Sequence, residues 1–320
     1  MRRILLLNRV SPDGLESLPS EDYIVSTEVS NPDAIIVRSF DMHGFRVPDS
    51  VKVIGRAGTG VNNIPLNEMT ERGIPVFNAP GANANAVTEI VIASLIGGAR
   101  KLSPALDFVK SLEGDDGAIE KAVEKEKKAF VGIEIAGRTL AVVGLGKIGL
   151  KVARAAQALG MDVRGYDPSL TPEGMSRVCM EKIKLVRTLG ELVDQAHFLT
   201  VHVPLTEVTR DMIGPSELVL MNNQGIVLNF ARHGIVNEDA VISALDSGRL
   251  GRYVSDFPQG RARCHPKCET YPHLGASTVE SEIKCAQMVA ERIHKYLNDP
   301  THDVTGAVNE AGLRALQKTA

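Results

Sequence analysis

The stretch GRTLAVVGLGKIGLKVARAAQALG, at residues 137–160, joins an apolar run to a glycine-rich turn and a helical pattern. Gly144, Gly146 and Gly149 follow the apolar run directly, in the spacing G-x-G-x-x-G. The first glycine permits a tight turn, the second lets a pyrophosphate approach the backbone, and the third allows close packing. N–H groups at the start of the following helix then face the anion. The stretch therefore predicts a strand, a phosphate-binding turn and a helix that ends at Gly160.

A dinucleotide site of this kind also needs an acidic residue at the end of the next strand. The segment VRGYDP supplies Asp167 at that place. Its carboxylate can accept hydrogen bonds from the adenosine ribose hydroxyls and would repel a 2′-phosphate. Strand, turn, helix, strand and acid together predict a site for NAD rather than NADP.

A second glycine-rich turn, VKVIGRAGTGVNNIP at 51–65, does not meet the same requirements. Asn62 and Pro65 follow it in place of an uninterrupted helix, and Asn78 ends the next strand where an acid is needed. The turn still exposes backbone N–H groups beside the guanidinium of Arg56, which suits a small carboxylate or phosphate. We therefore assign this turn to substrate binding.

Short β-branched runs alternate with helical patterns along the chain, which predicts an α/β fold with parallel, doubly wound sheets. Apolar residues keep helical spacing over 85–113 and lie on one face of a helix over 283–297. Another helix is expected in NEDAVISALDSG, with Asn237 as its N-cap and Gly248 just past its end. The expected strands are RRILLL, AIIVRS, VKVIGR, IPVFNAP, RTLAVVG, DVRGYD, HFLTVHVP, GIVLNFA and RYVSDF. A chain of 320 residues is long enough for two such domains.

Charge and composition exclude several classes of protein. The net charge of −3 comes from interspersed basic and acidic residues, without the basic stripe that nucleic acids require. The apolar run in MRRILLLNRV is too short for a secretory signal or a membrane span, so we interpret it as a buried strand. Four cysteines are too few for a disulfide scaffold in a chain of this length. The expectation is a cytoplasmic protein without nucleic-acid or membrane partners.

The segment CHPKC, at 264–268, raises the question of a metal site. It offers two cysteines and His265, but a structural zinc normally takes four ligands in a recognisable spacing, and no second pair is near in sequence. We expect no metal.

Five segments together resemble one known family. GRAGTGVNNI, FNAPGANANAVTEI, GRTLAVVGLGKIG, NFAR and PHLGAST resemble the D-2-hydroxyacid dehydrogenase family in order and spacing, over residues 35–297. The resemblance implies a substrate-binding domain of residues 1–96 and 283–320, with a Rossmann NAD-binding domain of residues 97–282 inserted into it. It also implies a homodimer formed through the cofactor domains, and a short form without a further regulatory domain.

By this resemblance, the function is the NAD-dependent oxidation of 3-phosphoglycerate to 3-phosphohydroxypyruvate, the first step of serine synthesis, by hydride transfer. One alternative is a reductase for glyoxylate, hydroxypyruvate or another 2-oxo acid. A second is an NAD-binding regulatory protein without turnover.

Hydride removal from a 2-hydroxy acid requires a base for the hydroxyl proton and a cation for the carboxylate. Arg232 follows the expected strand GIVLNFA, at the end of a parallel sheet where ligands bind, and its guanidinium can hold a carboxylate through two hydrogen bonds. His273, in YPHLGAST, matches the family's acid–base histidine. The family's supporting glutamate has no counterpart in DFPQGRARCHPKC. We favour Asp256 as its replacement, while Glu269 and an unsupported His273 remain open.

Two other positions depart from the family pattern. His233 follows Arg232 where relatives usually have glycine, and Asn62 stands where they commonly show aspartate. The resemblance extends the cofactor-binding set to Gly144, Gly146, Lys147, Ile148, Gly149, Asp167, His202, Val203, Pro204, Thr209, Asn229, Phe230, Ala231, Asp256 and Gly275. It assigns substrate binding to Arg38, Arg56, Ala57, Gly58, Asn83 and Lys127.

Overall fold

A computed structural model describes residues 1–319, which form two units. Of these residues, the first unit consists of 1–86 and 276–319, and the second of 87–275. Each unit contains one parallel sheet, so the prediction of two α/β domains, one inserted into the other, is confirmed. The division lies earlier in the chain than the expected breaks at 96 and 282, which fall inside the helices α2 (Ala84–Ala99) and α10 (Val279–Asn298).

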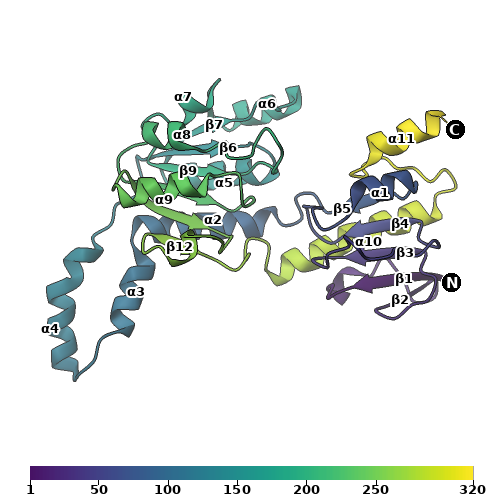
Figure 1. The fold of residues 1–320 in the computed structure, drawn as a ribbon, viewed down its shortest axis with the longest axis horizontal. Helices are drawn as coiled ribbons and strands as arrows, with labels where there is room; N and C mark the ends of the chain where they lie inside the picture. The colour runs from purple at the N-terminus through teal and green to yellow at the C-terminus, as the bar shows by residue number, and fades with distance from the viewer. Residues whose placement is uncertain (320) are drawn as a thin grey trace. The chain divides into compact units, whose positions relative to one another are not determined.

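The sheet of the first unit has five strands in the order β2-β1-β3-β4-β5 (Figure 1). They are β1 (Arg2–Leu7), β2 (Tyr23–Ser26), β3 (Ala34–Val37), β4 (Val53–Arg56) and β5 (Val76–Asn78). All except β2 were expected. The remaining elements are the 3-10 turn η1 (Pro12–Gly14), α1 (Leu66–Glu71), α10 and α11 (Glu310–Thr319). Helix α10 packs on β4 and β5 and buries four apolar residues of its expected face, Ala286, Val289, Ile293 and Leu297.

The C-terminal segment covers the edge strand β5. The N–H of Val308 donates to the carbonyl of Val76 at 2.7 Å, and the side-chain oxygen of Asn309 accepts the N–H of Val76 at 2.9 Å. The amide nitrogen of Asn309 also donates to the carbonyl of Ile74 at 3.0 Å. Backbone groups that an exposed edge would leave unpaired are therefore satisfied.

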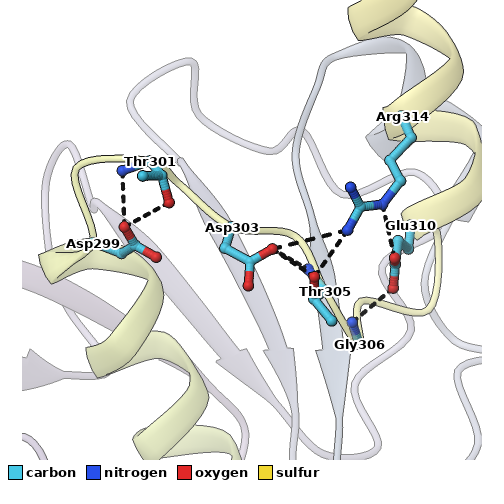
Figure 2. A network of polar contacts seen from close by, with 7 residues as sticks. All are labelled: Asp299, Thr301, Asp303, Thr305, Gly306, Glu310 and Arg314. Carbon is cyan, nitrogen blue, oxygen red and sulfur yellow. Dashed lines mark hydrogen bonds and ion pairs between the residues drawn. The ribbon is translucent and has the colours of Figure 1, made fainter.

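A network of polar contacts stabilises the segment that connects α10 to α11 (Figure 2). The carboxylates of Asp299 and Asp303 each accept hydrogen bonds from the threonine two residues later, Thr301 and Thr305. Arg314 on α11 donates to Thr305 at 2.8 Å. These short turns direct the chain back toward β5.

The sheet of the second unit has seven strands in the order β12-β11-β10-β9-β6-β7-β8. They are β6 (Thr139–Val143), β7 (Asp162–Tyr166), β8 (Lys184–Leu185), β9 (Phe198–Val201), β10 (Gly225–Asn229), β11 (Leu250–Ser255) and β12 (Cys268–Thr270). Five helices alternate with them: α5 (Lys147–Ala158), α6 (Pro172–Met180), α7 (Leu189–Val193), α8 (Pro215–Leu220) and α9 (Glu238–Asp246). A 3-10 turn, η3 (Ala262–Cys264), precedes β12. The strand order reverses direction between β6 and β9, the position at which doubly wound sheets bind ligands.

Local helix signals are confirmed in this unit. Asn237 caps α9 by accepting the N–H of Ala240, and Gly248 adopts a φ of 75° just beyond the helix. Gly160 likewise ends α5 with a φ of 83°. Glycine tolerates this left-handed conformation without steric cost.

The helical pattern over 85–113 belongs to two helices rather than one. Helix α2 ends at Ala99, and α3 (Leu102–Lys110) begins after Lys101, which adopts a left-handed φ of 53°. Helix α4 (Asp116–Glu126) and the 3-10 turn η2 (Lys127–Phe130) follow. Neither α3 nor α4 contains a buried residue, and both extend away from the sheet of their unit in Figure 1. Within residues 1–319, none of the helices has both the length and the apolar character needed to span a bilayer.

Candidate active site

The glycine turn between β6 and α5 depends on a close backbone contact. Gly144 adopts a φ of 84°, and a methyl group on Gly149 would lie 1.9 Å from the carbonyl oxygen of Gly144. A methyl group on Gly144 would lie 2.8 Å from the carbonyl oxygen of His202. Only glycine at 144 and 149 is compatible with the present backbone of the turn.

Gly146 differs from these two glycines, because packing within the protein does not require a glycine at this position. It is exposed at the N-cap of α5 with a φ of −69°, and no atom lies within 4 Å of the place a methyl group would take. Lys147, the first residue of the helix, is also exposed. A helix N-terminus beside such an open space fits the pyrophosphate of a dinucleotide.

Asp167 directly follows β7, beside the glycine turn. Its Oδ2 accepts the N–H of Leu145 at 2.9 Å, and its Oδ1 accepts the N–H of Ser169 at 2.9 Å. The side chain is partly exposed. The acid thus lies at the carboxyl edge of the sheet, in contact with the glycine turn.

The segment after β9 also lies at the carboxyl edge of this sheet. Partly buried His202 shares a 3.0 Å hydrogen bond between its Nε2 and Thr200, and burial lowers its pKa to about 3, so the ring is neutral near pH 7. Thr209 folds the following loop by donating from its hydroxyl to the carbonyl of Pro204 at 2.6 Å. Val203 is partly buried between these two features.

Arg232 lies in a turn that Asn229, the last residue of β10, holds in place. The Asn229 amide donates to the carbonyl of Arg232 at 2.9 Å and accepts the N–H of Ala231 at 3.1 Å. Burial lowers the pKa of Arg232, but a guanidinium stays protonated at neutral pH. The positive φ of this turn falls on Gly234, at 84°, so His233, which stands where relatives usually have glycine, does not need a left-handed conformation.

His273 lies in the turn after β12, in a left-handed conformation with a φ of 57°. Its ring packs against the ring of Phe257 in a T-shaped arrangement, at a centroid distance of 5.3 Å. The backbone N–H of His273 donates to the backbone carbonyl of Asp256 at 3.1 Å. The Asp256 carboxylate accepts the backbone N–H groups of Leu274 at 2.6 Å and Gly275 at 2.7 Å. Asp256 is therefore the residue that fixes the backbone of the histidine turn.

Asp256 also connects this turn to that of Arg232. Its backbone N–H donates to the carbonyl of Asn229 at 3.0 Å, so a hydrogen bond joins the carboxyl ends of strands β10 and β11 close to Arg232. Burial raises the pKa of Asp256, while the bound N–H groups and nearby His273 act in the opposite direction. Arg232, Asp256 and His273 thus follow three neighbouring strands and share one hydrogen-bonded frame.

Glu269, the other acid considered for His273, forms an ion pair. Its Oε1 lies 2.7 Å from Nη1 of Arg252, and both side chains are about nine-tenths buried. The pair joins β12 to β11, the strand on which Arg252 lies. Tyr271 extends this packing by stacking on Phe230 at a centroid distance of 6.1 Å. The pair therefore supports the strand that leads to His273.

Five of the six expected substrate-binding residues lie in the first unit, at the carboxyl ends of its strands. Arg38 follows β3, Arg56 ends the neighbouring β4, and Asn83 lies beyond β5. Ala57 and Gly58 belong to the turn after β4. The sixth residue, Lys127, lies in η2 of the second unit, where its ammonium group pairs with Glu124.

Two N–H groups of the turn after β4 are used within the protein. The N–H of Ala57 donates to the carbonyl of Val37, and that of Gly58 to the carbonyl of Arg56, both at 2.7 Å. The interpretation that this turn offers its N–H groups to an anion is therefore wrong for these two. The Arg56 guanidinium folds over Gly58, where a methyl group would lie 1.7 Å from Nη1. We expect an anionic ligand to meet this guanidinium.

The CHPKC segment is held by contacts of its own. His265 Nε2 lies 3.2 Å from Asp246, and its Nδ1 accepts the N–H of Lys267 at 3.1 Å. Burial raises the pKa of the Cys268 thiol to about 12, which disfavours the thiolate that metals bind. Among the described residues there is no group of three or more potential metal ligands.

Sequence reasoning missed two ion pairs near these groups. Arg252 pairs with Glu269, and Glu282 on the first turn of α10 pairs with Arg38 at 2.8 Å. Nothing in the local sequence pattern indicates either pair, because each depends on which strands and helices become neighbours.

Comparison with known proteins places these features in a family. Residues 92–275 match the model of a family described as D-isomer specific 2-hydroxyacid dehydrogenase, NAD binding domain. The chain is 36% identical over 283 residues to the D-3-phosphoglycerate dehydrogenase of Methanocaldococcus jannaschii, covering 84% of this chain and 51% of that protein. It is 33% identical over 317 residues to the D-3-phosphoglycerate dehydrogenase of Bacillus subtilis, covering 92% and 57%. The chain thus spans about half the length of these relatives.

A solved structure shows the same fold. The NAD+-bound 3-phosphoglycerate dehydrogenase of Entamoeba histolytica superimposes with a TM-score of 0.72 at 23% identity, covering 96% of this chain and 98% of the other.

The different roles of the glycines can be tested with two alanine variants. Gly146→Ala should cost less than about 1 kcal/mol of stability, because the site is open, but should weaken NADH binding at least about tenfold by filling the room of the pyrophosphate. Gly149→Ala should destabilise the protein by about 1–3 kcal/mol through overpacking. Thermal unfolding and NADH fluorescence titration measure the two effects. Unchanged NADH affinity in Gly146→Ala would contradict the assignment.

Proposed function

Because the chain belongs to the D-isomer specific 2-hydroxyacid dehydrogenase family, we propose that it oxidises 3-phosphoglycerate to 3-phosphohydroxypyruvate with NAD. The observation that carries this proposal is the hydrogen-bonded connection of Arg232, Asp256 and His273 after three neighbouring strands of the NAD-binding unit. The activity of the relatives from M. jannaschii and B. subtilis supports the choice of substrate.

The residues of the site divide the chemistry among them. NAD, when bound, supplies the acceptor for the hydride that leaves C2 of the substrate. His273 accepts the proton of the 2-hydroxyl group, and Arg232 binds the carboxylate and stabilises the carbonyl oxygen as it forms. Desolvation around Arg232 strengthens its interaction with the substrate anion.

Asp256 is a positioning residue in this proposal. Its carboxylate holds the two N–H groups that follow His273, so it sets the direction in which the imidazole is presented. Its charge also favours the imidazolium that forms when His273 takes a proton. It thereby takes the place of the glutamate that relatives carry.

The anionic groups of the substrate are assigned to the first unit as well. Arg56, with Arg38, binds the phosphate through charge-assisted hydrogen bonds. Asn83 completes this set, Ala57 and Gly58 form the turn that carries Arg56, and Lys127 remains a further candidate from the resemblance.

NAD is proposed to contact the carboxyl edge of the second sheet. The carboxylate of Asp167 accepts hydrogen bonds from the ribose hydroxyls, and N–H groups at the start of α5 bind the pyrophosphate. The further contacts are assigned to Gly144, Gly146, Lys147, Ile148, Gly149, His202, Val203, Pro204, Thr209, Asn229, Phe230, Ala231, Asp256 and Gly275.

We further propose a cytoplasmic homodimer. All four cysteines are free thiols, as in proteins of reducing compartments. Leu102, Leu106 and Val109 form one stripe of α3 and are all about half exposed, which is the pattern of a helix that packs on a partner.

Substrate choice can be tested by the oxidation of NADH with 3-phosphohydroxypyruvate, hydroxypyruvate and glyoxylate. We expect the highest kcat/KM with the phosphorylated acid and little activity with NADPH. Arg56→Ala should raise the KM for that acid by about 10- to 100-fold, and far less for hydroxypyruvate, because a charge-assisted hydrogen bond is lost. Arg46→Ala, an exposed arginine of the same unit, is the matched control. Preference for an unphosphorylated acid would favour the reductase, and absence of any turnover the regulatory protein.

The positioning role of Asp256 can be tested with Asp256→Asn. An amide can accept only one of the two N–H groups and turns a donor toward the other, so kcat/KM should fall by about 10- to 100-fold. The apparent pKa of kcat/KM should also fall, because the imidazolium loses a neighbouring negative charge. Asp239→Asn, at an exposed acid of α9, should change neither quantity. An unaltered pH profile in Asp256→Asn would remove Asp256 from the mechanism.

The dimer can be tested by light scattering. We expect a mass twice the 34.4 kDa of the chain. The double variant Leu106→Lys, Val109→Lys should halve this mass, since two charges cannot be buried in an apolar interface without a large cost. Val219→Lys, an exposed position on α8, should not. A monomeric wild-type protein would contradict the proposal.

A further inference from the structure

Two arginines of the first unit lie at the same edge of its sheet, and one of them pairs with a glutamate. Arg38 and Arg56 extend from the carboxyl ends of adjacent parallel strands, β3 and β4. Nη1 of Arg38 lies 2.8 Å from Oε1 of Glu282, on the first turn of α10. The carboxyl ends of parallel strands are the usual place for an anionic ligand in an open α/β sheet.

These charges lie together around one buried side chain of α10. Cys285, one turn after Glu282, is 5% exposed, and Arg56, Arg38 and Glu282 all act on its thiol. Burial raises the pKa of Cys285, although the two arginines act in the opposite direction. Val37, the residue before Arg38, pairs with Arg56 in the sheet, so both arginines lie at the same edge of the first sheet, and Glu282 contacts one of them.

The Arg38–Glu282 pair remains accessible to a ligand. The exposed fractions of the two side chains are 29% and 34%. An ion pair at this degree of exposure contributes little to stability, so a ligand can displace the carboxylate at small cost. An anion that binds Arg38 is nevertheless repelled at short range by the negative charge of Glu282.

We propose that Glu282 is an internal competitor for Arg38, which lowers the affinity of the Arg38 and Arg56 site for a phosphate group. The choice of phosphate rests on the proposed function, whereas the competition itself rests on the ion pair. Glu282 thus sets how strongly the protein distinguishes a phosphorylated acid from an unphosphorylated one.

The test measures the binding of inorganic phosphate by calorimetry, at constant ionic strength set with chloride. Glu282→Gln keeps the shape of the side chain and removes its charge, so phosphate should bind about three- to tenfold more tightly. Glu280→Gln removes an equal charge from an exposed position on the same turn and should change the affinity less than twofold. Thermal unfolding confirms that each variant is folded.

A double-variant cycle assigns the effect to Arg38. In the Arg38→Met background, Glu282→Gln should no longer tighten phosphate binding, because the contested cation is absent. The KM for 3-phosphohydroxypyruvate should fall by the same factor as the phosphate affinity rises in Glu282→Gln, while the KM for hydroxypyruvate should not.

The outcomes separate this inference from the proposed function. Weaker, unchanged or undetectable phosphate binding in Glu282→Gln overturns the inference, and weaker binding would mean that Glu282 orients Arg38 for the ligand. An effect that persists in the Arg38→Met background overturns it as well. Tighter phosphate binding without turnover of any phosphorylated acid supports the inference and contradicts the proposed function.

Discussion

Asp256 is the residue on which the geometry of the candidate active site depends. Its backbone N–H donates to the last residue of β10, and its backbone carbonyl accepts the N–H of His273. Its carboxylate accepts the N–H groups of the two residues after that histidine. Only 1% of the residue is exposed, so water does not compete for these bonds. A buried carboxylate is costly unless several donors face it, and the turn after β12 supplies them. The positions of Arg232 and His273 are therefore set by one shared residue.

The two glycine-rich turns show how similar sequences take different structures. In the turn after β6, close contact between Gly144 and Gly149 brings the helix start against the strand and leaves open space at Gly146. In the turn after β4, the side chain of Arg56 lies over Gly58, and N–H groups of the turn bind neighbouring carbonyls. The first arrangement leaves open space at the start of α5, whereas the second places a guanidinium over the turn.

Ion pairs support the two units in different ways. The Arg252–Glu269 pair is nearly buried, where removal of one partner would leave an uncompensated charge, so it holds β12 beside β11. The Arg38–Glu282 pair is partly exposed and can exchange its carboxylate for another anion. Burial thus makes one pair structural and leaves the other adjustable.

The sequence by itself determined the features that depend on short-range patterns: the alternation of strands and helices, the glycine turn with Asp167, and the helix ends at Asn237, Gly160 and Gly248. Steric and hydrogen-bonding requirements within a few residues decide these. The short strands β2 and β8 and the break at Lys101 were not predicted, because neighbouring elements stabilise them. Tertiary structure alone decided that Asn309 binds β5, that Glu269 binds Arg252, and that Glu282 reaches Arg38. Such partners lie on different elements, up to more than two hundred residues apart, and only the packing of helices on sheets brings their charges and hydrogen-bonding groups within reach.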